Sequence, residues 1–535
     1  MTAAGLDPRT PVVIGVGQAA ERIEDPGYAC LSPIDLAVAA VRAAVGDSQA
    51  AGAAVIAAID AIAATRQFEN SSSRAVAPLG KSTKFPLSVA HRLGAAPRRA
   101  MLDVVGGQSP QHLVSEFSRA IAAGLSDVVL LVGAEAISTI RHYAHADHKP
   151  DFSDDPAGQI EDRGFDLTDL VTPAMAAHGM ARPSTQYALL ENARRAAQGR
   201  SRAEYAAAMG ELFAPFTEVA AKNPFSAAPV LRSAEELVTI TERNRMIADP
   251  YPRFVVSRDQ VNQGAAMLLA SVSAAQRLGV ARNRWVFLHG QADLVERSLL
   301  QRAVLGEAPS AVAAVHHALE VAHVGLDDID FFDFYSCFPI AVFNIIDAIG
   351  LSATDPRGLT LTGGLPFFGG PGNNYSMHAI AEAVARVRSR TGSFALVSAN
   401  GGMLSKTSVG VYSATPTPRR PDHSQLVQRE IDQRDAPAVA ERPTGWATIE
   451  TYTVTHGRNG PTGIVIGRLE SDGSRFVAKV ADGDDELLAV LQTGDEPVGQ
   501  RIYVTTVGDG NRVGISRGAA AQGVSEAQVG VARAW

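Results

Sequence analysis

Runs of apolar residues alternate with amphipathic stretches along the first half of the chain. Residues 11–17, 59–63 and 127–132 are short apolar runs, and the middle run is either a strand or a helix end. Residues 32–44 have apolar positions at helical spacing, and a second helix is predicted to end at Gly124. Further core segments are expected at 254–257 and 261–270. Strands that alternate with helices predict an α/β protein with a mostly parallel sheet covered on both faces.

The second half repeats this layout. A helix at 311–322, a strand at 329–335, a glycine-rich loop at 363–371, a helix at 377–388 and a strand at 393–398 are expected. A glycine-rich turn, a helix, an apolar strand and a glycine turn therefore occur twice, after Gly107 and after Gly370. The chain is predicted to contain two pseudo-repeated βαβαβ halves, with the ligand site in the cleft between them.

Three further segments interrupt or follow these halves. The two halves are the N-terminal half (1–140 and 237–275) and the C-terminal half (276–413). The further segments are a loop and helical excursion (141–236), a linker (414–442) and an all-β domain (443–535). A short helix is predicted near 425–433 in the linker. Close apolar runs at 447–455, 463–469, 476–480, 487–491 and 502–507 predict a small antiparallel barrel, followed by a weakly ordered stretch at 516–535.

Composition narrows the class of protein. The 535 residues carry a formal net charge of -8, which disfavours nucleic acid and anionic membranes as partners. No apolar run approaches the ~18 residues of a membrane span, and the first residues lack the pattern of a signal peptide. Two distant cysteines, Cys30 and Cys337, fit a reducing compartment, so a cytoplasmic location is expected. Histidines and aspartates gather at 142–155, but their spacing matches no standard ligand pattern, and no metal site is predicted.

The turn at Gly107 is the most informative point of the sequence. An apolar strand reaches Asp103, passes through Gly106 and Gly107, and enters a helix. A turn of this kind presents a nucleophile at a helix N-terminus, where backbone N–H groups and the helix dipole stabilise negative charge. The residue in the nucleophile's place is a glycine, which carries no reactive side chain.

Several short motifs in residues 10–412 resemble those of thiolases, and most closely those of the sterol-carrier-protein type. The matching stretches are 120–129, Gly-Ala-Glu-Ala-Ile-Ser at 133–138, Val-Asn-Gln-Gly-Ala-Ala at 261–266, Asp-Asp-Ile-Asp at 327–330 and Gly-Gly-Met at 401–403. The resemblance implies the thiolase fold, an acyltransferase relationship within lipid metabolism, and a coenzyme A thioester as ligand with no tightly bound cofactor. The C-terminal barrel resembles the OB-fold domains that accompany thiolase-like enzymes, without the cysteines of their zinc hook, and fits a lid or docking module. The resemblance leaves the oligomeric state open, since thiolases are commonly dimers or tetramers.

The same resemblance implies that four catalytic positions are degenerate. The nucleophilic cysteine corresponds to Gly107, the catalytic histidine to Gly370, the second cysteine to Ser398, and the Asn or His of the oxyanion hole to Tyr335. Thiolase chemistry needs a thiolate that takes the acyl group and a group that moves the α-carbon proton. The chain is therefore expected to bind acyl-CoA without catalysing the standard thiolase reaction.

Two further readings of the altered site remain open. Tyr335, with Tyr375 or His378, is a candidate catalytic set for a non-covalent carbon–carbon lyase acting on a β-hydroxyacyl-CoA, with Gly107 leaving room for the ligand. Alternatively, the two tyrosines are buried packing residues, Asn373–Asn374 is a helix cap, and the chain is a non-catalytic acyl-CoA-binding or scaffold protein. Cys337 is interpreted as structural, because thiolase variants also carry a cysteine there.

Overall fold

The structure, a computed structural model, describes residues 6–167, 170–418, 420–457 and 460–521. Its first sheet has the strand order β1-β8-β4-β2-β3-β5. Strands β2, β3 and β4 run parallel, and β8 runs antiparallel to both β1 and β4. All residues of β2, β4 and β8 and most residues of β1 and β3 are buried, as expected for a sheet covered on both faces, whereas both residues of β5 are exposed. The strands are β1 (Pro11–Ala20), β2 (Ala61–Ala64), β3 (Arg99–Leu102), β4 (Val128–Ala136), β5 (Glu161–Asp162) and β8 (Asn262–Ser271).

The second sheet repeats the first with two strands fewer. Its order is β10-β11-β12-β9, in which β10 and β11 are parallel and the other two pairs are antiparallel. The same directions hold for β2-β4-β8-β1, so the predicted pseudo-repeat and thiolase fold are confirmed. The strands are β9 (Phe287–Val295), β10 (Ile329–Asp333), β11 (Phe394–Gly401) and β12 (Lys406–Ser413).

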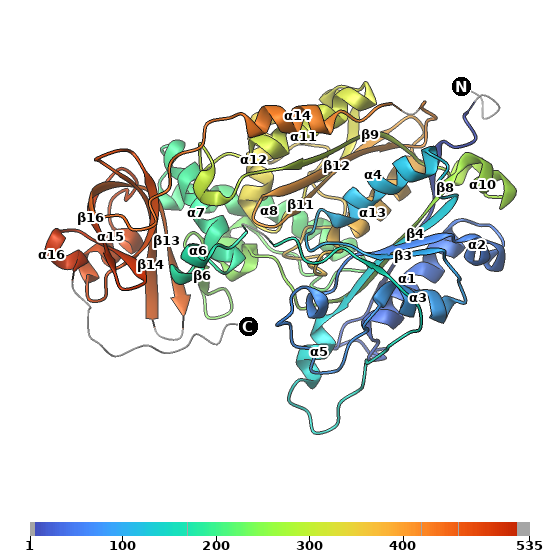
Figure 1. Cartoon of the computed structure of the whole chain (residues 1–535), viewed down its shortest axis with the longest axis horizontal. Coiled ribbons are helices and arrows are strands. Elements are labelled where there is room, and N and C mark those ends of the chain that lie inside the picture. Colours follow the sequence, from blue (N-terminus) through green and yellow to red (C-terminus); the bar gives the residue numbers. More distant parts are fainter. Residues whose placement is uncertain (1–5, 168–169, 419, 458–459, 522–535) are drawn as a thin grey trace.

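Helices form three layers around the two sheets (Figure 1). Helices α4 (Ser109–Ala122) and α13 (Tyr375–Ser389) lie between the sheets and contact strands of both. The outer face of the first sheet is covered by α1 (Pro33–Asp47), α3 (Phe85–Leu93) and α10 (Val272–Arg277), with α2 (Gly52–Ala58) against α1. Helix α11 (Pro309–Ala322) covers the second sheet and contacts α12 (Pro339–Ile349). Both central helices therefore begin in the cleft between the halves, which positions the site.

The excursion consists of loops and helices, as the sequence predicts. Its two longest helices pack against α12, and the second begins with a capping box in which Ser201 and Glu204 bond each other's backbone N–H. The two short strands that follow the excursion extend toward the C-terminal domain. These elements are α5 (Ile137–Tyr143), α6 (Pro173–Ala177), α7 (Pro183–Ala197), α8 (Arg202–Lys222), α9 (Ala234–Val238), β6 (Met246–Ala248) and β7 (Tyr251–Pro252).

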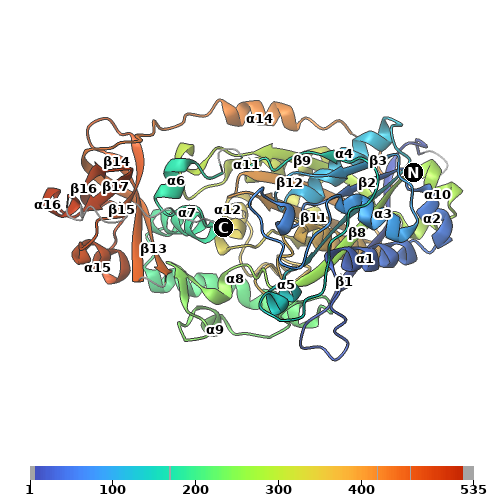
Figure 2. The ribbon, with the colours of Figure 1, turned by 60° about the horizontal axis from the view of Figure 1, so that its bottom comes forward.

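The C-terminal domain is a closed barrel of five strands, in the order β14-β15-β17-β16-β13 with β13 pairing back to β14. A barrel is confirmed, but it is not wholly antiparallel, because β15 and β17 run parallel. Figure 2 shows it at one end of the molecule, joined to the body by a segment that contains α14 (Ser424–Asp432), which lies along α11 and β9. The strands are β13 (Gly445–Gly457), β14 (Gly460–Leu469), β15 (Arg475–Val480), β16 (Arg501–Val507) and β17 (Gly510–Gly514), and α16 (Arg517–Ala520) follows them.

Buried polar contacts fix the barrel to the body. Arg475 is fully buried and donates to the Glu450 carboxylate and to the carbonyl oxygens of Leu300 (2.9 Å) and Arg302 (2.5 Å). Arg195 of α7 donates to Glu496 at 2.5 and 2.8 Å, and β13 pairs with β6. Two charged side chains buried with partners make the barrel an integral part of the structure.

One predicted strand is wrong. Residues 487–491 lie in helix α15 (Asp485–Thr493), because Asp484 caps its N-terminus and Leu487 and Leu491, four residues apart, both face the barrel core. The core segment expected at 254–257 overlaps the 3₁₀ turn Arg253–Val255, in which Val255 is buried. Of the predicted weakly ordered stretch, residues 522–535 lie outside the described part of the chain.

Candidate functional site

The turn after β3 meets the glycine-rich loop of the second half. The N–H of Gly106 donates to Asn373 Oδ1 at 2.9 Å, and Ser376 Oγ donates to the carbonyl oxygen of Gly107 at 2.6 Å. Ser109, the first residue of α4, donates to the buried carboxylate of Asp103 at 2.5 Å. The turn is therefore held from both halves, in the cleft where the pseudo-repeat predicts the site.

Tyr335 occupies the space beside Gly107. A β-carbon on Gly107 would stand 2.6 Å from Tyr335 Cζ, closer still to the Tyr335 hydroxyl, and 2.6 Å from the carbonyl oxygen of Asn400. Real β-carbons do not approach other atoms closer than 3.0 Å, so this position accepts only glycine while Tyr335 holds its place. The expectation that Gly107 leaves room for a ligand is wrong, because the tyrosine ring fills that room.

Tyr335 is a buried, neutral phenol. It is 7% exposed, and burial raises its pKa above the ordinary value, with the Cys337 thiol adding to the shift. None of the hydrogen bonds among the described residues involves its hydroxyl, and the bond of Tyr335 to Ser398 comes from the backbone N–H. A phenol in this state can donate a hydrogen bond but is a poor base at neutral pH.

The ring of Tyr375 packs against the ring of Tyr335. The two rings are 5.3 Å apart and nearly perpendicular. Unlike Tyr335, Tyr375 has a bonded hydroxyl, 2.6 Å from Thr362 Oγ1 and donating to Asp333 Oδ1 at 3.2 Å. Burial raises the pKa of Asp333 to about 6 and that of Tyr375 well above its ordinary value. This network spans the end of β10 and the start of α13, so it positions the Tyr335 ring.

His378 is separated from the two tyrosines by a phenylalanine ring. Phe368 lies 6.1 Å from Tyr375 and 5.1 Å from His378, measured between ring centroids. His378 Nδ1 is 2.7 Å from Gln18 Oε1, and burial lowers the pKa of the imidazole to about 3. The structure thus places Tyr335 and Tyr375 in contact, whereas Phe368 lies between Tyr375 and His378.

The other two degenerate positions lie around the same cleft. A β-carbon on Gly370 would stand 2.6 Å from Ser257 Oγ, and the Gly370 N–H donates to the carbonyl oxygen of Arg258 at 2.7 Å. Ser398, buried on β11, accepts a long hydrogen bond of 3.5 Å from the Tyr335 N–H. Burial raises the pKa of the nearby Cys337 to about 12, so its sulfur is a thiol rather than a nucleophilic thiolate.

Several side chains at the site were missed by the sequence analysis. Tyr187 of α7 accepts a hydrogen bond from Asn400 Nδ2 at 2.9 Å and stacks on Phe338, with ring centroids 4.4 Å apart. No spacing in the sequence connects this residue of the excursion with the turn. Asn373 and Asn374 are named in the sequence analysis, but as a helix cap, and this is wrong. Neither side chain caps α13, because Asn373 donates to the Arg66 carbonyl oxygen at 2.6 Å and Asn374 to that of Gly133 at 2.7 Å.

Known structures identify the family. The chain is 48% identical to a monomeric SCP2-thiolase like protein type 1 from Mycobacterium smegmatis, with a TM-score of 0.83 over 96% of this chain and 100% of that one. The chain belongs to the SCP2-thiolase like protein type 1 family. Residues 426–509 match the family model described as the thiolase-like protein type 1 additional C-terminal domain. No protein with a curated description matches this type 1 chain.

More distant structures share only the fold with this type 1 protein. The Ltp2-ChsH2(DUF35) aldolase is 19% identical, with a TM-score of 0.55 over 76% of this chain and 98% of that one. Human mitochondrial 3-ketoacyl-CoA thiolase is 16% identical, with a TM-score of 0.54 over 76% of this chain and 100% of that one. Both cover about three quarters of the type 1 chain.

A cavity rich in arginine opens beside the Gly370 loop of this type 1 protein. Its volume is about 320 Å³, and its charged lining consists of Arg232, Arg243, Arg253, Arg258 and Asp259. Asp259 pairs with Arg141 at 2.5 Å, and burial together with the neighbouring Arg253 and Arg232 lowers the pKa of Arg258. The cavity therefore carries an excess of positive charge that suits an anionic ligand.

This arginine cavity, defined by the five residues named above, connects to the altered site through the backbone. Ser257, which lines it, donates its N–H to the Cys337 carbonyl oxygen at 2.9 Å, and Arg258 bonds Leu365 and Gly370. Among the described residues, no cluster of side chains fits a metal ion. None of the helices in that part of the chain is long and apolar enough to cross a membrane.

Proposed function

We propose that this type 1 protein binds acyl-CoA and does not catalyse the standard thiolase reaction. The observation that carries the proposal is the arginine cavity beside the Gly370 loop, together with a nucleophile position that Tyr335 fills. Coenzyme A carries several phosphate charges, for which guanidinium groups are suited donors. The acyl end would extend along residues 257–258 toward the Gly370 loop, where neither a thiolate nor an imidazole is present.

Calorimetric titration with coenzyme A and acetoacetyl-CoA tests binding. Charge reversal of two exposed cavity residues, Arg243→Glu with Arg253→Glu, is expected to weaken binding at least tenfold, and added salt to weaken it in the unaltered protein. The matched control is Arg42→Glu on the exposed side of α1, which should leave binding unchanged. Equal affinity of the cavity variant and the control for coenzyme A would show that the arginine cavity is not the binding site.

The absence of thiolase turnover is tested separately. Purified protein incubated with acetoacetyl-CoA and coenzyme A should leave acetoacetyl-CoA unconsumed over the rate without protein. Consumption proportional to protein concentration, with two acetyl-CoA formed per substrate, would overturn this half of the proposal without touching the binding site.

A second proposal is the non-covalent lyase, and the unpartnered hydroxyl of Tyr335 favours it. In this reaction a β-hydroxyacyl-CoA loses its hydroxyl proton, its Cα–Cβ bond breaks, and the α-carbon takes up a proton, which yields a carbonyl compound and a shorter acyl-CoA. Tyr335 would donate to the developing enolate oxygen. Tyr375, whose hydroxyl bonds Thr362 and Asp333, would position it, whereas His378 lies on the far side of Phe368.

We also propose that the protein is a monomer. The outer edge of β3 is covered by β5 of the same chain, which pairs Met101 with Glu161 and Leu102 with Asp162, so this edge is not free to pair with a second copy. The Mycobacterium smegmatis relative is described as monomeric. Light scattering after size-exclusion chromatography is expected to give about the 56.1 kDa of one chain, and a mass near twice that value would contradict the proposal.

A further inference from the structure

His178 lies where the body of the protein meets the C-terminal barrel. It directly follows α6 of the excursion and is 2% exposed. The backbone N–H of Asn511, on β17 of the barrel, donates to its Nε2 at 2.6 Å. On the other side of the ring, Nδ1 lies 2.6 Å from the carbonyl oxygen of Ala174 in α6. One imidazole ring therefore joins the two parts of the chain.

These two contacts fix the protonation state of the ring. A carbonyl oxygen only accepts, so Nδ1 carries a proton, and a backbone N–H only donates, so Nε2 carries a lone pair. A proton on Nε2 would set two donors against each other at a buried position, which is unfavourable. The hydrogen bond between Asn511 and His178 therefore requires a neutral imidazole.

The end of α6 lies against a face of the barrel formed by β14, β15 and β17. A β-carbon on Gly179 would stand 3.0 Å from Ile464 Cδ1 and 3.5 Å from Lys479 Cε. Ile464 and Val477 belong to the apolar core of the body and not to that of the barrel. The bond of His178 to β17 is thus part of a larger interface.

The charged groups that face His178 disfavour a second proton on it. They are Lys479 of β15 and Arg512 of β17, and none of the groups that shift its pKa in the described part of the chain is a carboxylate. Burial, together with these two cations, lowers the pKa of His178 below its ordinary 6.5, and the bond to Ala174 only partly offsets this. The docked ring therefore binds a proton less readily than a histidine in water.

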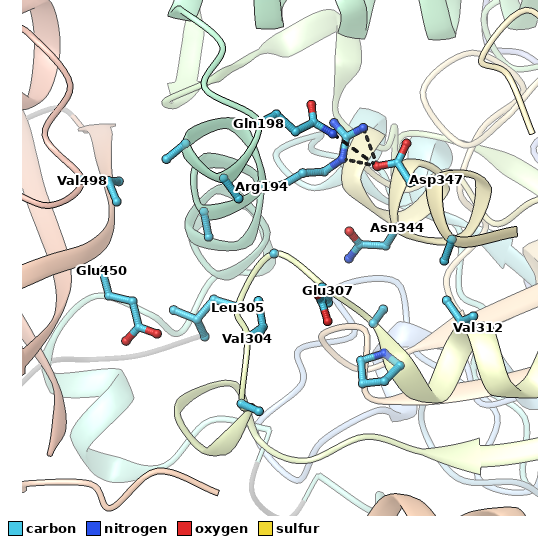
Figure 3. A pocket seen from close by; sticks show the side chains of 18 of the residues that line it. Arg194, Gln198, Val304, Leu305, Glu307, Val312, Asn344, Asp347, Glu450 and Val498 are labelled. Atoms are coloured by element: carbon cyan, nitrogen blue, oxygen red, sulfur yellow. Dashed lines mark hydrogen bonds and ion pairs between the residues drawn. The ribbon is translucent and has the colours of Figure 1, made fainter. Parts of the chain in front are cut away.

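The interface is interrupted by a large cavity. Its volume is about 900 Å³, and it separates Glu450 and Val498 of the barrel domain from the ends of α7 and α12 (Figure 3). On the body side, Figure 3 shows Arg194 paired with Asp347, at a distance of 2.7 Å. Barrel and body are therefore joined by separate contacts around this cavity, one of which is the contact at His178.

Two other polar contacts across the interface persist in mild acid. Arg475 of the barrel pairs with Glu450 and donates to two carbonyl oxygens of the body, and Glu496 of the barrel domain pairs with Arg195 of α7. Burial favours the neutral form of both carboxyl groups, but hydrogen bonds from arginine side chains bring their pKa values below the ordinary value. Both carboxyl groups are therefore still ionised at the pH at which a histidine takes up a proton.

We propose that His178 is a pH-sensitive contact between body and barrel, and that a proton taken up from water at its Nε2 releases β17 from α6 while the contacts of Arg475 and Arg195 remain. Above pH 6.5 the ring is neutral whether it is docked or released, so the contact has its full strength. As the pH falls below 6.5, the released ring binds a proton that the docked ring does not, and the released state becomes more favourable. The proposal does not depend on acyl-CoA binding.

Hydrogen exchange of the Asn511 amide in the full chain tests the proposal, because this N–H donates to His178. Mass spectrometry with fragmentation that resolves Asn511 measures the exchange rate, which is compared with the rate of an unstructured chain at the same pH. The protection obtained in this way should be constant above pH 6.5 and fall below it, by at most about tenfold per pH unit, the limit for one titrating group. Constant protection between about pH 7.5 and 5 would overturn the proposal.

Variants assign the change to His178. His178→Gln keeps an acceptor for the Asn511 N–H but does not titrate, so its protection should not fall in this way, whereas His91→Gln, on an exposed histidine of α3, should behave like the unaltered protein. Lys479→Gln removes one of the two cations and should move the loss of protection to higher pH. If His178→Gln fails to fold, Lys479→Gln decides. The same loss in a folded His178→Gln protein, or an unchanged midpoint in Lys479→Gln, would overturn the proposal.

Discussion

The Cζ atom of Tyr335 lies 2.6 Å from the point where a β-carbon on Gly107 would stand. The two replacements are therefore one structural unit, because a tyrosine in this position requires a glycine opposite it. Tyr335 comes from the second half and Gly107 from the first, so their contact closes the cleft that the pseudo-repeat creates. The absence of a nucleophile at position 107 is therefore linked to the packing of Tyr335 and is not the replacement of a single residue.

Restoring the nucleophile should destabilise the protein. Gly107→Cys places atoms where the Tyr335 ring lies, and overpacking of this kind costs about 1–3 kcal/mol of the free energy of unfolding. Combined with Tyr335→Ala, which vacates the space, the cost should fall well below the sum of the two single changes. Urea unfolding of the four proteins measures this coupling.

Gly46→Ala is the control for that experiment, because a β-carbon at Gly46 in α1 meets no atom within 4 Å. It should leave stability unchanged or raise it slightly. Additive effects of Gly107→Cys and Tyr335→Ala would show that the two residues do not compete for the same space.

Removing the hydroxyl of Tyr335 or of Tyr375 should have different effects on the free energy of unfolding. Tyr335→Phe is expected to change the free energy of unfolding by less than about 1 kcal/mol, because its hydroxyl has no partner among the described residues. Tyr375→Phe removes bonds to Asp333 and Thr362 and should cost about 1–3 kcal/mol. Chemical unfolding measures both, and a larger cost for Tyr335→Phe would contradict the structure described here.

Tyr335→Phe also tests the lyase proposal. If the hydroxyl donates to an enolate, the variant should lose most activity on a β-hydroxyacyl-CoA, since one such donor is worth roughly 10²–10³ in rate. Liquid chromatography of the acyl-CoA products follows the reaction. A stable variant with unchanged activity would remove Tyr335 from the mechanism.

The sequence predicts the layers of the fold better than the contents of the site. Periodicity and glycine turns locate the two halves, the barrel and the turn at Gly107, because those signals are local. The contact of Tyr335 with Gly107, and of Tyr187 with Asn400, joins segments more than two hundred residues apart, and no local signal encodes it. The helix at 485–493 was missed for another reason, since a five-residue apolar run fits a buried strand and a short helix equally well.

The buried arginine of β15 should be far more important for stability than an exposed one in the same barrel. Arg475→Met leaves the Glu450 carboxylate short of a partner and the carbonyl oxygens of Leu300 and Arg302 without their donor, with an expected cost of about 3–5 kcal/mol. Arg501 is 57% exposed where it pairs with Glu470, so Arg501→Met should have a far smaller effect. Thermal unfolding compares the two, and similar melting temperatures would show that the barrel is not anchored through Arg475.

Acid should destabilise the protein in part through His378. Gln18 donates from its Nε2 to Glu382 at 2.9 Å, so its Oε1 accepts from His378 Nδ1–H, and the imidazole is neutral with Nε2 unprotonated. Burial lowers the pKa in the folded protein to about 3, against the 6.5 of an unperturbed histidine. Between these two pKa values the histidine is protonated in the unfolded chain and neutral in the folded protein. The free energy of unfolding therefore has its full value above pH 6.5 and decreases as the pH falls toward 3.

The expected slope is about 1.4 kcal/mol per pH unit between pH 6 and 4 for this one group. His378→Asn keeps a donor at the Nδ1 position but does not titrate, so the stability difference between the unaltered protein and this variant should shrink with that slope as the pH falls. In this difference, the contributions of all titrating groups that the substitution does not affect cancel. His91→Asn, on an exposed histidine of α3, should give a difference that does not vary with pH in this way. Urea unfolding at several pH values measures both differences, and parallel curves for the unaltered protein and His378→Asn would mean that the imidazole is not held neutral by burial.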